Sequence, residues 1–121
     1  MSTTANDGAH CRGDVVLVLY PNADLRTAKR RPALVVQADG LNTGLSQVVV
    51  AMISSKVFRA GHPSRVIVNP GSPETPCSGL LNDSVVMIDN LATIATCEID
   101  RKIGALAMNG IDAALRHTLG L

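Results

Sequence analysis

Two arginines followed by a proline, Arg30-Arg31-Pro32, lead directly into the apolar segment Ala33 to Gln37. A residue before proline is biased toward extended backbone, because the pyrrolidine ring clashes with a helical neighbour. Proline donates no hydrogen bond, so Pro32 suits the first position of a strand. We therefore expect Arg31 at the mouth of a sheet. There its planar guanidinium would present a fork of donors to a phosphate or carboxylate.

Positive charge gathers in the first half of the chain, although the formal net charge is only +1. Residues 8–66 hold eight Lys or Arg against three Asp, whereas residues 67–121 hold three basic residues against six acidic ones. Such asymmetry favours a polyanion-binding face, and an unevenly charged surface that is merely solvated is the alternative. The candidate contacts on such a face are Arg26, Lys29, Arg30, Lys56, Arg59 and His62.

Aromatic residues are nearly absent, since Tyr20 and Phe58 are the only two. Proteins that bind single-stranded nucleic acids usually stack bases on aromatic rings. Binding of such a ligand is therefore expected to rest on arginines, hydroxyls and backbone groups. The three cysteines and three histidines are far apart in the sequence, so we expect no disulfide, no metal site and no cofactor.

Short strands are the elements that must position these side chains. A chain of 121 residues allows one domain, and its first 12 residues resemble a loose polar leader before a domain at residues 13–121. No apolar run approaches the ~18 residues that span a bilayer, so we expect a cytoplasmic protein. Valine- and isoleucine-rich runs bounded by turn residues predict strands at 15–20, 33–37, 47–53, 65–68 and 84–89, with weaker candidates at 91–95 and 101–106.

The last segment changes to a helical period. Asn109 is placed to cap a helix, Ile111, Leu115 and Leu119 share one stripe, and Gly120 marks the end. No helix-length connection separates consecutive strands, which disfavours a parallel sheet. We therefore predict an α+β fold that is mainly β: a small, strongly curved antiparallel sheet with a C-terminal helix. Strands this apolar are covered either by a second copy in an isologous dimer or within one domain.

An ordered set of phrases along residues 13–121 resembles the MazF/PemK family of toxin ribonucleases. The set begins with the Gly-Asp-Val strand at 13–18 and the Arg-Arg-Pro segment. It continues with the strand at 48–55 that ends in Ser54-Ser55, and with the segment at 81–90 that contains Ser-Val-Val. The closing phrases are at 101–104, 114–116 and 119–121. The resemblance implies an SH3-like barrel of the CcdB/MazF/PemK type, a homodimer, and metal-independent, sequence-specific cleavage of single-stranded RNA, as in an mRNA interferase. It also implies a MazE-like antitoxin whose disordered tail occupies the RNA groove.

Carried over by position, the family's catalytic arginine falls on Arg31 and its catalytic threonine on Ser54, where serine keeps the hydroxyl. RNA supplies its own nucleophile, because a 2′-hydroxyl can attack the adjacent phosphorus in line. The expected products are a 2′,3′-cyclic phosphate or 3′-phosphate and a 5′-hydroxyl. We expect Arg31 to stabilise charge on the phosphate oxygens and Ser54, with Ser55 as a second donor, to hydrogen-bond them. Asp89 and His62 are the candidates for the base that takes the 2′ proton.

The chain also departs from the family pattern. Residues 21–30 lack a glutamate that relatives often carry in this loop, and Ala92 stands where many relatives have an arginine. Met87 occupies a position where some PemK-type members place an arginine. Two alternatives therefore stay open: a CcdB-like non-enzymatic toxin that binds DNA gyrase, and a weakened relative that only binds RNA or antitoxin.

Overall fold

A computed structural model describes residues 10–21, 24, 26–72 and 77–121 of the chain. In chain order the elements are β1 (Asp14–Pro21), β2 (Ala28–Val35), β3 (Gln47–Ser54), the 3-10 helix η2 (Val57–Arg59), β4 (Arg65–Val68), β5 (Ser84–Ala95), the 3-10 helix η3 (Thr96–Glu98), β6 (Ile99–Ala105) and α1 (Asn109–Leu119). Residues 1–9 of the predicted leader lie outside the described residues.

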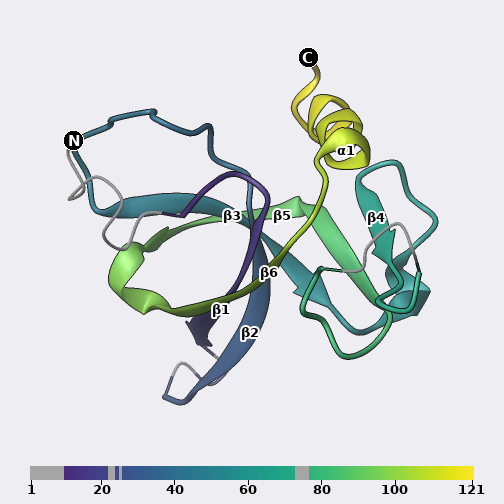
Figure 1. Cartoon of the computed structure of the whole chain (residues 1–121), viewed down its shortest axis with the longest axis horizontal. Helices are drawn as coiled ribbons and strands as arrows, with labels where there is room; N and C mark the ends of the chain where they lie inside the picture. The colour runs from purple at the N-terminus through teal and green to yellow at the C-terminus, as the bar shows by residue number, and fades with distance from the viewer. Residues whose placement is uncertain (1–9, 22–23, 25, 73–76) are drawn as a thin grey trace.

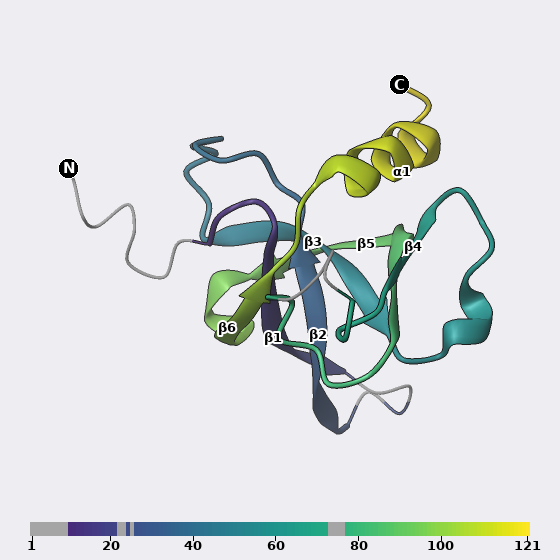
Figure 2. The ribbon, with the colours of Figure 1, turned by 45° about the vertical axis from the view of Figure 1, so that its right-hand side comes forward.

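The six strands form one antiparallel sheet in the order β4-β5-β3-β2-β1-β6. The sheet is strongly bent, and α1 lies at one end of it (Figures 1 and 2). It is not closed, so β4 and β6 are its two edge strands in the described part of the chain. The predicted architecture, a curved antiparallel sheet with a terminal helix, is confirmed.

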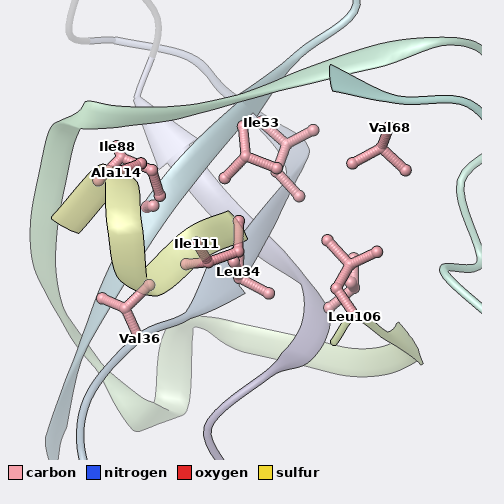
Figure 3. Close-up of a cluster of buried hydrophobic side chains, with 11 residues drawn as sticks. Leu34, Val36, Ile53, Val68, Ile88, Leu106, Ile111 and Ala114 are labelled. Carbon is pink, nitrogen blue, oxygen red and sulfur yellow. The ribbon is translucent and has the colours of Figure 1, made fainter. Parts of the chain in front are cut away.

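Both faces of the central strands are buried, which explains why their sequences are apolar without alternation. On one face, Leu34 and Val36 pack with Ile111 and Ala114 of α1 in a cluster that also includes Ile53 and Ile88 (Figure 3). The opposite face carries a second cluster, built from Val16, Val18, Ala33, Val35, Val48, Val50 and Met52. The strands therefore cover most of their apolar surface within one chain.

Three local predictions differ from the structure. Pro32 lies inside β2 and not at its start, because the strand begins at Ala28 and pairs with β1 along its whole length. Pairing of β2 with β3 begins only at Ala33, so Pro32 stands where one side of the strand is an edge, a place that tolerates a missing donor. Asn109 makes no capping hydrogen bond, since the cap position is Met108. The predicted strands at 84–89 and 91–95 are one strand, β5.

Arg12 joins the start of the domain to its last helix. Its side chain donates to the Val36 carbonyl at 3.0 Å and to the Asp112 carboxylate of α1 at 2.6 Å. Its backbone N–H donates to the Asp39 carboxylate at 2.8 Å. Gly120 ends α1 as predicted, in the left-handed conformation with φ 72°.

Two glycines allow the segment before β5 to lie directly against β6. A Cβ built on Gly104 would stand 2.3 Å from the Cys77 carbonyl oxygen, and one on Gly79 would stand 2.0 Å from the Ile103 carbonyl oxygen. The Ala105 N–H donates to the same Cys77 carbonyl at 2.8 Å. No larger residue fits at either position without moving backbone.

We predict that Gly104→Ala destabilises the protein by about 1–3 kcal/mol, because the added methyl group meets backbone that cannot turn away. Gly110→Ala is the matched control, since a Cβ at Gly110 meets nothing within 4 Å and the site lies in a helix. The control should leave stability equal or raise it slightly. Urea unfolding midpoints measure both, and equal midpoints for the two variants would contradict the contact.

Candidate functional site

A groove of about 730 Å³ lies beside residues 29–32 of β2, which do not pair with β3. It is lined by residues of β1, β2, β3, β5 and β6 and of the segments at 55–59 and 79–82. None of the described residues that line it is acidic. Six are basic, which gives the groove the charge expected of a polyanion site: Lys29, Arg30, Arg31, Lys56, Arg59 and Arg101.

Arg31 and Ser54 lie on the neighbouring strands β2 and β3, just beyond the stretch in which these strands pair. The paired residues are Ala33 with Met52, Leu34 with Ala51, and Val35 with Val50. Arg31 and Ser54 are each two residues beyond the last of these pairs. Side chains alternate along a strand, so both point to the face that carries Ala33 and Met52. Arg31 and Ser54 both line the groove.

Ser54 is the last residue of β3 and is half-buried. Its side chain makes a hydrogen bond with the backbone of the segment that follows. Its Oγ accepts a hydrogen bond from the Lys56 N–H at 3.1 Å. That bond uses a lone pair, so the hydroxyl proton can be donated to another acceptor. Ser55 and Lys56, both exposed, follow directly in the wall of the groove.

The neighbours of Arg31 on β2 have different surroundings. Lys29 and Arg30 line the groove with it, but Arg30 also forms an ion pair with Asp100 of β6 at 3.3 Å. Arg26 belongs to the connection between β1 and β2 and does not line the groove. In that connection the Arg26 N–H donates to the Asp24 carboxylate at 2.9 Å, which orders the turn.

A break in the pairing of β5 with β3 leaves Asp89 and Asn90 outside that ladder. The register with β3 jumps between Ala51, which pairs with Leu91, and Met52, which pairs with Met87. The intervening residues are released from that ladder. Asn90 lines the groove, whereas Asp89 does not.

Asp89 instead binds Arg65 of β4 through both carboxylate oxygens, at 2.7 and 3.2 Å. These hydrogen bonds hold the pKa of Asp89 below its usual value, with burial acting in the opposite direction. They also raise the pKa of Arg65. A carboxylate that binds a guanidinium in this way is a weak proton acceptor.

His62 also lies outside the lining of the groove. Its Nδ1 accepts a hydrogen bond from the Ser64 N–H at 3.0 Å, and its ring packs edge-on against His117 of α1 with centroids 5.9 Å apart. The structure therefore brings together Arg31, Ser54, Ser55, Lys29, Arg30, Lys56 and Arg59, and leaves Arg26, Asp89 and His62 outside.

The sequence analysis did not predict the residues that line the groove opposite β2. Arg101 of β6 lines the groove, and so do Asn82, Asn90 and the apolar Leu80 and Leu81. Arg101 falls in the acidic half of the sequence, so the charge asymmetry gave no sign of it. Only the pairing of β6 with β1, which sets Arg101 beside Leu17, brings it to the basic side.

The part of the chain that the structure describes meets neither the requirements of a metal site nor those of a membrane-spanning helix. No three His, Cys, Asp or Glu side chains gather there as a possible metal site. None of the helices described is long and apolar enough to cross a membrane.

Comparison with known proteins identifies the fold and the family. Residues 11–119 match the family model of the PemK-like, MazF-like toxin of type II toxin–antitoxin systems. The chain is 32% identical over 107 residues to the endoribonucleases MazF2 of Mycobacterium bovis and MazF6 of Mycobacterium tuberculosis, over 85% of this chain and 90% of each relative.

Solved structures agree with this match. One is an endoribonuclease in complex with its cognate antitoxin from a mycobacterial species, with a TM-score of 0.71 and 25% identity over 93% of this chain and 97% of that one. Another is the Mycobacterium tuberculosis toxin MazF-mt6, with a TM-score of 0.64 and 28% identity over 88% and 97% of the two chains. The chain therefore belongs to the PemK-like, MazF-like family of toxins of type II toxin–antitoxin systems.

Proposed function

We propose that the chain is a metal-independent endoribonuclease that cleaves single-stranded RNA at a short sequence in the cytoplasm, as the toxin of a toxin–antitoxin pair. The observation that carries the proposal is that Arg31 of β2 and Ser54 of the neighbouring strand β3 both line one basic groove. The relatives named endoribonucleases support it. A CcdB-like gyrase binder would have no use for this arginine–hydroxyl pair.

The reaction needs alignment and charge stabilisation more than an activated water. The 2′-oxygen of the substrate attacks the adjacent phosphorus, a 2′,3′-cyclic phosphate forms, and the bond to the 5′-oxygen breaks. Negative charge gathers on the non-bridging oxygens as the transition state forms. The guanidinium of Arg31 can bind two of these oxygens at once, and the Ser54 hydroxyl, with Ser55 beside it, can donate to one of them.

The proton transfers are not assigned to Asp89 or His62. The 2′-hydroxyl must lose a proton and the 5′-oxygen must gain one, but both candidate bases lie outside the lining of the groove. Asp89 is also bound by Arg65. The proposed mechanism therefore rests on Arg31 and Ser54 as stabilisers of charge.

The same groove suits an antitoxin segment. Its lining combines the six basic side chains with Leu80, Leu81 and Met87, so an acidic peptide with apolar side chains would match it in charge and in surface. A related structure contains an endoribonuclease with its cognate antitoxin. We propose that an antitoxin competes with RNA for this groove, and that the chain acts as a homodimer.

Cleavage of RNA by the purified protein should persist in EDTA and should stop when the 2′-hydroxyl at the scissile nucleotide is replaced by hydrogen, because the substrate then lacks its nucleophile. Product mapping on matched ribo- and deoxy-substituted oligonucleotides measures this. Efficient cleavage of the deoxy substrate would require an external nucleophile and would overturn the mechanism.

Arg31→Ala and Ser54→Ala should each slow single-turnover cleavage by about 10²–10³-fold, in line with the loss of one transition-state donor. The double variant should lose less than the product of the two effects, because both groups act on one phosphate. Ser54→Thr keeps the hydroxyl and should stay within about tenfold of wild type. Circular dichroism on each variant confirms folding, and cleavage at wild-type rate by folded Arg31→Ala and Ser54→Ala would place the active site elsewhere.

Arg101→Ala should weaken RNA binding and reduce its dependence on salt by about 0.7 in the slope of log K against log[salt], the effect of one lost phosphate contact with a single strand. Arg116→Ala is the matched control, because it removes the same charge from α1, away from the groove. Binding titrations at several salt concentrations give both slopes. Equal slopes for the two variants would show that Arg101 does not contact the backbone of RNA.

A further inference from the structure

Phe58 is exposed to an extent that the core does not explain. It is the central residue of η2, and 80% of its surface is accessible. Burial of a phenylalanine side chain is normally stabilising, so its exposure here leaves that apolar surface available to a ligand. η2 lies at the edge of the molecule, beside β4, as the short teal coil in Figure 2.

Two residues close to Phe58 in the chain belong to the lining of the basic groove, although Phe58 itself does not. Lys56 and Arg59 both line it. The hydrogen bond from the Lys56 N–H to Ser54 Oγ connects η2 directly to the hydroxyl proposed to bind the phosphate, four residues before Phe58. The guanidinium carbon of Arg59 stands 6.0 Å from the centre of the Phe58 ring. An exposed ring therefore stands in a short segment with two cations, in continuity with the site.

A side chain of the sheet holds η2, the segment that contains Phe58, in place. Arg65 of β4 donates from Nη1 to the Arg59 carbonyl at 3.0 Å, while its Nε and Nη2 bind Asp89. The short helix closes on itself through the Arg59 N–H to the Lys56 carbonyl at 3.0 Å. The Asp89–Arg65 pair thus braces the segment that presents Phe58, which gives Asp89 a structural task in place of proton transfer.

We propose that Phe58 is a stacking residue for an unpaired RNA base beside the scissile phosphate, with Arg59 and Lys56 binding the neighbouring phosphates. Aromatic rings next to cations are the usual platform for single-stranded nucleic acid, because every base offers a π-face. The reaction context rests on the proposed function, but the stacking itself is a binding claim. RNA is favoured over a protein partner because two cations of the groove lining, Lys56 and Arg59, lie within two residues of the ring in the chain.

Truncation of the ring tests the proposal. Phe58→Ala should weaken binding of single-stranded 2′-O-methyl RNA, which the protein cannot cleave by 2′ attack, by about 5- to 150-fold. Phe58→Tyr should bind within a few-fold of wild type. Val57→Ala is the matched control, since it removes apolar surface from the same short helix, where Val57 is 49% exposed, without removing a ring.

A fluorescent reporter tests stacking directly. The chain has no tryptophan, so Phe58→Trp supplies a single indole. Its emission should be quenched on titration with the same RNA, whereas Leu41→Trp, at a cavity lined by residues of α1, should not respond. In the Phe58→Trp background, Asp89→Asn should reduce the quenching at saturating RNA, and Asp89→Glu should restore part of it.

The outcomes separate this inference from the proposed function. Wild-type affinity of folded Phe58→Ala, or an unquenched indole in Phe58→Trp at saturation, overturns the stacking role even if the wild-type protein cleaves RNA. Loss of self-association in Phe58→Ala at unchanged RNA affinity would identify a protein contact and also overturn it. Quenching and weakened binding in a protein that never cleaves RNA would support stacking while refuting the nuclease.

Discussion

The site depends on a change in the environment of β2 at Pro32. On one side of the proline, Leu34 and Val35 are fully buried on opposite faces of the sheet. On the other side, Lys29 to Arg31 are exposed and β3 no longer pairs with the strand. Because a slip of one residue would exchange the two buried faces, the cores fix the register of β2 against β3. The paired stretch ends two residues from Arg31 and two residues from Ser54, so buried apolar residues position a polar site.

Because of the irregularity in β5, the adjacent residues Asp89 and Asn90 have different contacts. A regular strand would alternate its side chains and keep pairing with β3, whereas the jump in register frees Asp89 and Asn90. Asp89 then reaches Arg65 on one side, and Asn90 reaches the groove on the other. The Asp89 carboxylate is thereby neutralised by an arginine outside the groove, and every charged side chain in the described lining of the groove is basic.

Sequence patterns predicted the features that depend on neighbouring residues in the chain. The strand at Arg65–Val68, the terminal helix with Gly120 after it, and the family followed from apolar runs and short phrases. The positions of Asp89, Arg101 and Phe58 did not, because each depends on contacts between distant segments. Arg101 reaches the groove through the β1–β6 pairing, and Phe58 stays exposed although an aromatic residue in an apolar chain would be expected to join a core.

The order of the strands in space also sets the order in which the site can form during translation. β1 is synthesised first among the strands, but its outer partner, β6, is synthesised last. Arg101 and Ile103 of β6 belong to the lining of the groove, so the groove is incomplete while β6 is still unmade. Since domains fold as units when their last elements appear, the groove stays unassembled on the ribosome until β6 has been synthesised.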